Sequence, residues 1–279
     1  MKYLFFDLDG TLKGKSREFT PANKQALYDA QKAGHKVFLC SGRCPEYLKR
    51  TICQEFPFDG VVGCAGGSVL IGDQCIFENA IPDEILVPLI DFFRAEGIDY
   101  SLETTEGNFQ TPGTMAVFHD LYKHIAAVDP KAAEASKREE RCGANRPIAE
   151  YDPARRTVQK ICFTIYSRES HERFAKFVDP YFNRVYFADE DDMIFGEIIL
   201  KTVTKAQGIE QVLKYFGAEV SDSVGFGDSM NDYQMMEYAG TRVVYEKAPE
   251  ELLALGDYFF RDPDQDGIAQ VMREAGLIG

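Results

Sequence analysis

The chain of 279 residues is 45% hydrophobic and 27% charged, which is ordinary for a globular protein and leaves room for one large domain or two modest ones. Its net charge of −14 argues against a nucleic acid or an anionic membrane surface as a partner, because no basic cluster offsets it. No apolar run approaches the roughly 20 residues that span a bilayer, and no secretory segment opens the chain, so we expect a cytoplasmic location.

Strands and helices alternate through the first part of the chain. Residues 2–7 form a nearly continuous apolar run, which is typical of a central parallel strand buried on both faces. We expect further strands at 36–40 and 60–63, with helices at 20–33 and 45–55 between them. This alternation predicts an α/β fold whose core is a doubly wound, mostly parallel, Rossmann-like sheet.

The pattern changes after residue 82, where strand-like segments and helices follow one another as in a smaller α+β unit. The expected strand-like segments of this unit are 100–109, 160–166 and 184–187. Its expected helices are 83–96, 131–141 and 169–177.

The alternating α/β pattern resumes near residue 204, with a helix to residue 215, a strand at 223–226 and a helix at 232–238. We therefore predict a core formed by residues 1–81 and 196–279 and an inserted α+β domain at 82–195. Hinges between the two are expected at 79–83 and 195–204, where Pro82 and Gly196 suit the role.

Cysteine and histidine spacings indicate neither disulfides nor zinc. The seven cysteines form no CxxC pair, and the four histidines are isolated along the chain. An odd number of cysteines without a signal peptide favours reduced thiols. We therefore expect no zinc site.

Two carboxylates follow the first strand, in the segment Asp7-Leu8-Asp9-Gly10-Thr11. Residues i and i+2 of a strand face the same side, so Asp7 and Asp9 can share one site. Open α/β sheets bind ligands beyond the carboxyl ends of their strands, which is where this pair falls. Neighbouring carboxylates repel unless they are neutralised, and a divalent cation with oxygen ligands is a natural solution. An acid-rich turn is the alternative interpretation.

A second strand also ends in acids, in Gly227-Asp228-Ser229-Met230-Asn231-Asp232. Asp228 can complete a magnesium shell, and Asp232 can either ligate the ion or orient a metal-bound water. Acids are common in loops and at helix N-caps, but that alternative does not account for two acidic strand ends in one chain.

Two further segments offer partners for a phosphate. Ser41-Gly42-Arg43 follows the second strand and precedes a helix that begins at Pro45, so its hydroxyl and amides can form an anion site. Lys205 opens a helix, where a lysine is mildly unfavourable against the helix dipole unless an anion offsets it. A Ser-Gly turn and a solvated lysine are the alternative interpretations.

Together these four segments resemble, in the same order, the motifs of the haloacid dehalogenase-like (HAD) superfamily. Residues 7–11 match its first motif, Ser41 the second, Lys205 the third and residues 227–232 the fourth. The insertion at 82–195 resembles the C2-type (IIB) cap of the Cof-like phosphatases.

The resemblance implies a magnesium-dependent phosphatase that hydrolyses a small phosphorylated metabolite, with sugar phosphates favoured. Asp7 would be the nucleophile that forms an aspartyl-phosphate, and Asp9 would be the general acid and base. Mg²⁺ would be held by Asp7, the backbone carbonyl of Asp9 and Asp228. The implied phosphate-binding residues are Ser41, Gly42 and Lys205, and the implied supporting residues are Thr11, Arg43, Asn231 and Asp232.

Other functions compete with this interpretation. A phosphosugar mutase shares the same chemistry, and a non-enzymatic metabolite-binding protein could keep the fold. The segments Cys64-Ala65-Gly66-Gly67 and Tyr245-Glu246-Lys247-Ala248 depart from the Cof-like pattern, so we expect an altered substrate preference. Within the cap, the sequence leaves four side chains free to point toward or away from substrate: Tyr100, Glu103, Arg155 and Lys160.

Overall fold

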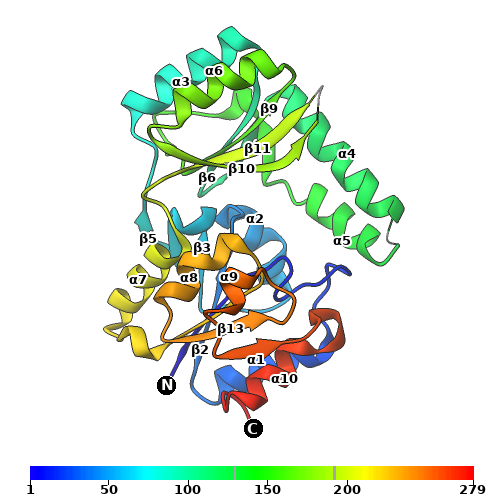
Figure 1. Cartoon of the computed structure of the whole chain (residues 1–279), viewed down its shortest axis with the longest axis vertical. Helices are drawn as coiled ribbons and strands as arrows, with labels where there is room; N and C mark the ends of the chain where they lie inside the picture. Colours follow the sequence, from blue (N-terminus) through cyan, green and yellow to red (C-terminus); the bar gives the residue numbers. More distant parts are fainter. Residues whose placement is uncertain (129, 191–192) are drawn as a thin grey trace.

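The structure, a computed structural model, describes residues 1–128, 130–190 and 193–279. These residues form two units, one above the other along the long axis of the molecule, and both chain termini lie in the lower unit (Figure 1). Each unit is built on its own β-sheet. Across the described ranges, every helix is too short or too polar to cross a membrane.

The lower unit contains the larger sheet, with strand order β14-β13-β12-β1-β2-β3-β4-β5 over the described residues. The strands from β14 to β3 run parallel, and β4 and β5 are added antiparallel at one edge. The predicted α/β class with a mostly parallel sheet is therefore confirmed. The strands are β1 (Tyr3–Phe6), β2 (Lys36–Cys40), β3 (Gly60–Gly63), β4 (Ser68–Ile71), β5 (Gln74–Glu78), β12 (Ser223–Gly227), β13 (Thr241–Tyr245) and β14 (Tyr258–Phe260).

Helices cover both faces of this sheet, so its central strand is buried on both sides. Leu4 and Phe6 of β1 join one apolar cluster with side chains of α1 and α10, whereas Tyr3 and Phe5 join another with side chains of α7 and α8. This explains why β1 is continuously apolar. The helices of the lower unit are α1 (Pro21–Lys32), α2 (Pro45–Arg50), α7 (Lys205–Phe216), α8 (Tyr233–Tyr238), α9 (Glu250–Leu253) and α10 (Gly267–Glu274).

The upper unit contains a second sheet, with strand order β10-β11-β9-β6-β7-β8 over the described ranges, antiparallel except for the pair β7–β8. Helices α3 and α6 cover its outer face, and its inner face is turned toward the lower unit (Figure 1). The strands are β6 (Asp99–Thr104), β7 (Gly107–Gln110), β8 (Asn145–Pro147), β9 (Lys160–Ile165), β10 (Phe182–Asp189) and β11 (Ile194–Leu200). The helices are α3 (Asp83–Glu96), α4 (Pro112–Val128), α5 (Pro130–Glu140) and α6 (Arg168–Val178).

One predicted hinge residue is misplaced. Gly196 lies inside β11, where it is paired with Tyr186 of β10 on one side and Phe163 of β9 on the other. A Cβ atom at Gly196 would lie 2.3 Å from the carbonyl oxygen of Val185, so the glycine serves close strand packing instead of bending. The predicted boundary between residues 195 and 196 thus cuts a strand, whereas the one after residue 81 falls between β5 and α3.

The chain crosses between the two units twice, at 79–82 and 201–204, and the crossings lie side by side. Asn79 Nδ2 donates hydrogen bonds to Thr202 Oγ1 at 3.5 Å and to Gln207 Oε1 at 3.1 Å. The second crossing also touches the loop after β3, because a Cβ at Gly66 would lie 1.9 Å from the carbonyl oxygen of Thr204. The residue before α7 is therefore packed against the loop after β3.

Candidate active site

The candidate site lies where three neighbouring parallel strands end. β1, β2 and β12 are adjacent in the larger sheet, and each is followed directly by a residue singled out from the sequence: Asp7, Ser41 and Asp228, respectively. The backbone N–H of Asp7 donates to the carbonyl of Phe226 at 2.9 Å, which continues the pairing of β1 with β12. The three side chains therefore converge at one edge of the sheet.

Lys205 links two carboxylates of this edge. It is the first residue of α7, and its side chain is 1% exposed. Its Nζ lies 2.5 Å from Asp7 Oδ1 and 2.5 Å from Asp232 Oδ1. Burial lowers the pKa of the lysine, but Asp232 and Asp7 raise it by more, so the pKa stays above its ordinary value. Lys205 therefore carries a positive charge against Asp7.

Asp232 holds the loop after β12 in place. Its Oδ2 accepts hydrogen bonds from the backbone N–H groups of Asp228 at 3.0 Å and Ser229 at 3.3 Å, while its Oδ1 binds Lys205. A Cβ at Gly227 would lie 2.6 Å from Asp232 Cγ, so only glycine leaves room here. With both oxygens already engaged, Asp232 is better placed to position the site than to serve as a primary ligand.

Three carboxylates form a cluster that fits a divalent cation. One oxygen from each of Asp7, Asp228 and Asp232 lies within 4.8 Å of the others. Burial and the other carboxylates raise the pKa of Asp7 well above its ordinary value, although Lys205 opposes this. Burial and Asp232 likewise raise the pKa of Asp228 to about 6. A hard cation with oxygen ligands would relieve this repulsion, so the donor set suits Mg²⁺.

The turn after β1 brings the backbone against Asp228. Gly10 has φ +96°, and a Cβ there would lie 2.3 Å from Asp228 Oδ2. Both the backbone conformation and the close approach therefore require glycine. Thr11 Oγ1 then donates a hydrogen bond to Asp228 Oδ1 at 2.8 Å. This pairing fixes the carboxylate that follows β12 to the loop that follows β1.

The Asp9 side chain is turned away from this cluster. It is 51% exposed and forms a bidentate ion pair with Arg43, at 2.7 Å from Nη2 to Oδ1 and 2.9 Å from Nε to Oδ2. Desolvation raises the pKa of Asp9, but Arg43 and other cations outweigh it, so the pKa lies below its ordinary value. The structure thus groups the carboxylates of Asp7, Asp228 and Asp232, and it pairs Asp9 with Arg43.

The other predicted residues surround the same space. Ser41 is buried, its Oγ accepts a hydrogen bond from the backbone N–H of Arg43 at 3.3 Å, and it lines a cavity together with Gly42 and Asn231. Asn231 Oδ1 accepts a hydrogen bond from Ser229 Oγ at 2.9 Å. The Ser41 hydroxyl and Asn231 amide are therefore available at the cavity wall.

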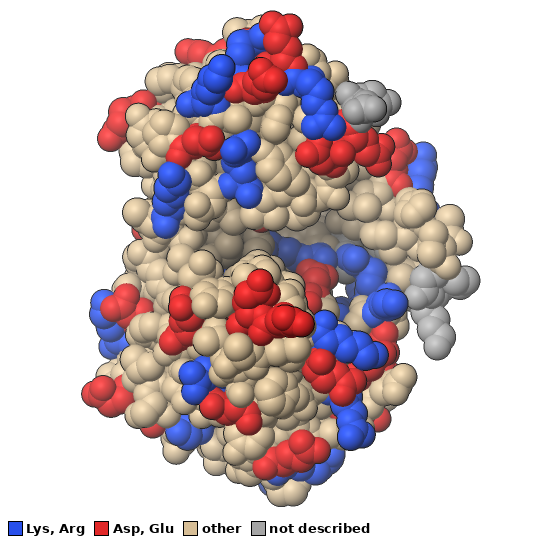
Figure 2. Space-filling view, in the orientation of Figure 1, with Lys and Arg blue, Asp and Glu red and all other residues tan. Residues whose placement is uncertain are grey.

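This cavity, of about 840 Å³, lies between the two units. Figure 2 shows the corresponding hollow across the middle of the molecule, with Lys and Arg side chains gathered inside it. From the upper unit, Glu103 and Lys160 point into the cavity, whereas Tyr100 belongs to the apolar core of that unit and Arg155 is exposed elsewhere. Glu197 also lines the cavity, although no sequence pattern singled it out.

Apolar side chains form a further wall of the cavity that the sequence did not predict. Helix α4 contributes Val117, Phe118, Leu121 and Ile125. Phe187 comes from β10, Phe195 from β11, and Met193 lies just before β11. The rings of Phe118 and Phe195 meet edge to face at 5.4 Å. Helix α4 has only Thr114 buried, so its apolar side chains serve the cavity and not a closed core.

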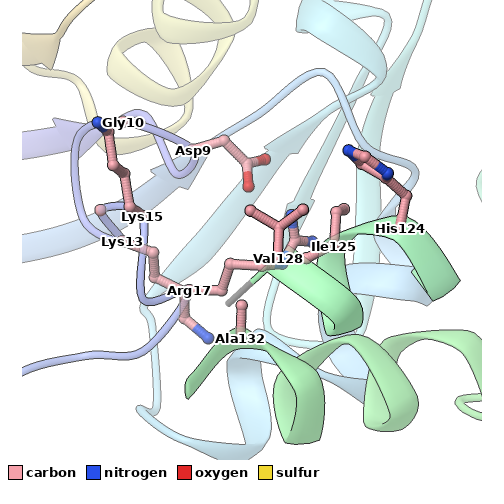
Figure 3. Close-up of a pocket in the computed structure, with 10 residues that line it drawn as sticks. Asp9, Gly10, Lys13, Lys15, Arg17, His124, Ile125, Val128 and Ala132 are labelled. Atoms are coloured by element: carbon pink, nitrogen blue, oxygen red, sulfur yellow. The ribbon is translucent and has the colours of Figure 1, made fainter. Parts of the chain in front are cut away.

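A smaller cavity of about 410 Å³ adjoins the first and shares Asp9, Arg17, His124 and Ile125 with it. Figure 3 shows the loop after β1, with its basic side chains, facing Ile125 and Val128 of α4 across this space. The basic residues of that loop in the cavity wall are Lys13, Lys15 and Arg17. The approach to Asp9 from this side is therefore positively charged.

Comparison with known proteins agrees with the fold. The sequence profile of the haloacid dehalogenase-like hydrolases matches residues 4–272. YkrA of Bacillus subtilis, which carries a provisional phosphatase name, is 26% identical over 277 residues, covering 99% of this chain and 98% of its own. A crystal structure of a protein from Geobacillus kaustophilus aligns with a TM-score of 0.82 at 20% identity, covering 99% of both chains. The structure of the HAD subclass IIB sugar phosphatase BT4131 aligns with a TM-score of 0.76 at 23% identity, covering 100% of both chains.

The fold and the comparisons define a hydrolase of the phosphatase type, built from an α/β unit and a second unit over the strand ends that carry Asp7, Ser41 and Asp228, called the catalytic edge below. The chain belongs to the haloacid dehalogenase-like hydrolases, and its predicted place in the Cof-like group of that superfamily is confirmed.

Proposed function

We propose that this protein is a magnesium-dependent phosphatase that hydrolyses a small phosphorylated metabolite through an aspartyl-phosphate on Asp7. The observation that carries the proposal is the buried arrangement of Asp7, Lys205 and Asp232 beside Asp228, at the strand ends that open into the cavity. Burial raises the pKa of Asp7, whereas Lys205 lowers it and a bound divalent cation would lower it further, favouring the unprotonated carboxylate. Such a carboxylate is suited to attack phosphorus.

The proposed metal ligands are the carboxylates of Asp7 and Asp228 and the backbone carbonyl of Asp9. When bound there, Mg²⁺ would supply positive charge that offsets the repulsion between an anionic nucleophile and an anionic substrate. Asp232 and Thr11 hold Asp228 and its loop in position through the hydrogen bonds described above.

The remaining residues divide the work on the phosphoryl group. Ser41 and the backbone of Gly42 donate hydrogen bonds to its oxygens, and Lys205 stabilises charge there while steadying Asp7. Asp9 protonates the leaving oxygen and then takes a proton from the attacking water. To act in this way, Asp9 must leave Arg43, because the ion pair favours the unprotonated carboxylate. We propose that a substrate phosphate draws Arg43 away as it enters.

We also propose that the upper unit is a C2-type cap that selects substrate, and that sugar phosphates are favoured. The position of the cavity between the two units supports this. Because β11 belongs to the upper sheet, we propose that the cap ends after Leu200 and that the residues 201–204 join it to the core.

The test is phosphate release from a panel of sugar phosphates, nucleotides and phosphorylated cofactors, each with Mg²⁺ and with chelator. Asp7→Asn keeps the size of the side chain but removes the nucleophile, and Asp91→Asn on α3, where Asp91 is 69% exposed, is the matched control. We expect Mg²⁺-dependent release from the parent and from Asp91→Asn, and none from Asp7→Asn. Equal release by Asp7→Asn would remove Asp7 as nucleophile. Phosphorus NMR would identify a mutase if it detected an isomerised phosphosugar and no free phosphate.

A further inference from the structure

A charged triad lies on the inner face of the cap sheet, formed by Glu103 of β6, Lys160 of β9 and Glu197 of β11. Lys160 Nζ lies 3.2 Å from Glu103 Oε2 and 2.5 Å from Glu197 Oε2. The side chains of Glu103, Lys160 and Glu197 are 7%, 5% and 12% exposed. The sheet register places Glu103 directly opposite Lys160, and Glu197 opposite Cys162, whose thiol donates to Glu103 Oε1 at 3.1 Å. The triad is therefore built into three adjacent strands.

The triad faces the catalytic strand ends. All three side chains line the same cavity as Asp7 and Ser41. They also lie close to the loop after β3, since Glu103, Lys160 and Glu197 all act electrostatically on the Cys64 thiol. Lys205 in turn acts on Glu197. The triad thus forms the roof of the cavity, opposite the core residues Asp7 and Ser41.

A role in stability alone is a poor explanation for these charges. Taking three charged groups out of water carries a desolvation penalty that a buried ion pair rarely repays, and apolar residues of similar volume would stabilise such a position as well or better. The same three strands accommodate apolar side chains on their other face, because Leu102, Ile161 and Ile198 belong to the apolar core of the cap. Charges kept in the roof of the cavity instead indicate a role in recognising a ligand.

The chemistry of the triad selects a particular kind of group. Two carboxylates and one ammonium leave a net negative charge, so a ligand carboxylate or second phosphate at the roof would be repelled. Glutamate oxygens accept hydrogen bonds, and lysine can donate up to three. Lys160 donates one to Glu197 and forms an ion pair with Glu103. Hydroxyl and amino groups satisfy such a mixed surface. Amides stand beside it as well, since Asn108 and Asn145 line the cavity and Asn108 Nδ2 donates to Asn145 Oδ1 at 2.9 Å.

The cavity is therefore polarised. Its core side offers Arg17 and Arg43 around Asp9, continuing into the basic loop of Figure 3, which suits the approaching phosphate. Its cap side offers the two glutamates of the triad, with Glu190 and Asp120 also in the wall. A substrate with a single anionic end fits this distribution in one orientation only.

We propose, building on the phosphatase function proposed above, that the Glu103–Lys160–Glu197 triad recognises the organic part of the substrate. The substrate class is a phosphate monoester with hydroxyl or amino groups at the end remote from the phosphate and no second acidic group there. Glu197 is a specificity-determining residue in this assignment.

A matched pair of six-carbon substrates tests the proposal. Sorbitol 6-phosphate and 6-phosphogluconate differ only at the carbon remote from the phosphate, which carries a hydroxymethyl group in one and a carboxylate in the other. We expect kcat/KM for phosphate release to be at least about tenfold higher for sorbitol 6-phosphate, because like charges repel at the roof. Equal or reversed values would overturn the proposal.

Glu197→Gln removes one carboxylate of the triad, so kcat/KM for 6-phosphogluconate should rise relative to that for sorbitol 6-phosphate. The ratio of the two kcat/KM values should fall at least about threefold. Glu172→Gln, on the exposed surface of α6, removes the same charge away from the cavity and should leave the ratio unchanged. An unchanged ratio in Glu197→Gln would remove Glu197 from specificity. If that variant does not fold, the ratio in the parent protein still decides the substrate class.

Binding separates this proposal from the phosphatase function on which it rests. Calorimetric titration of the two phosphates into Asp7→Asn with Mg²⁺ should show the same preference without turnover. Preference in binding with no phosphate release by the parent would refute the proposed phosphatase function and support the triad. Release without preference would support the phosphatase function and refute the triad.

Discussion

Replacing Lys205 by methionine tests the electrostatic design of the catalytic edge. The substitution keeps an unbranched side chain but removes the charge that lies 2.5 Å from both Asp7 and Asp232. Removing one partner of a buried ion pair leaves uncompensated charge and typically destabilises a protein by about 3–5 kcal/mol. For a chain of this size, such a loss lowers the melting temperature by on the order of 10 °C.

The assay is thermal unfolding followed by circular dichroism, in chelator and in Mg²⁺. Lys214→Met is the matched control, because Lys214 lies on the same helix in an exposed pair with Glu210 and should contribute under about 1 kcal/mol. Mg²⁺ should raise the melting temperature of Lys205→Met by more than that of the parent, since it restores positive charge to the three carboxylates. Equal melting temperatures of Lys205→Met and Lys214→Met in chelator would show that Lys205 does not balance the charge of these carboxylates.

Three further predictions address the carboxylates around this edge. In chelator, the free energy of unfolding, measured with urea, should fall as the pH rises from about 4 to 6. The pKa of Asp228 is raised to about 6, so the folded protein binds more protons than the unfolded chain in this window. The fall should be smaller in Asp228→Asn. Arg43→Gln should raise the pKa of Asp9 and move the high-pH limb of the kcat/KM profile upward by about one unit, and an unmoved limb would exclude Asp9 as the acid. Gly10→Ala should weaken Mg²⁺ binding at least about tenfold in a titration, because its Cβ would meet Asp228. Gly34→Ala, with φ +88° but open space around its Cβ, separates backbone strain from that contact.

The catalytic edge could be predicted from sequence because its signals are local. Each of Asp7, Ser41 and Asp228 directly follows an apolar strand, and parallel strands bring their carboxyl ends together whatever their separation in the chain. The helix that begins at Pro21 could also be predicted from the sequence. Thr20 is its N-cap, and its side chain accepts a hydrogen bond from the backbone N–H of Asn23.

The cap side of the cavity could not be predicted, because its residues are fixed by distant partners. β11 contains Glu197 in an otherwise apolar strand, and that glutamate is compensated by Lys160 from another strand 37 residues away. Helix α4 opens with Pro112 and Gly113, which suggest a turn, and its apolar stripe faces a cavity instead of a core. The pairing of Asp9 with Arg43 likewise depends on side-chain conformation, which strand and helix patterns do not report.

The two chain crossings lie side by side, so the upper unit is joined to the core at one place. Since its entry and exit are tied together by Asn79, Thr202 and Gln207, the core meets the whole insertion as if it were one surface loop. The contact of Gly66 with Thr204 then anchors the segment 201–204 just before Lys205, so the placement of Lys205 beside Asp7 does not depend on the inserted domain. A different inserted domain, or a short loop, could be grafted between these two positions without redesigning the catalytic edge.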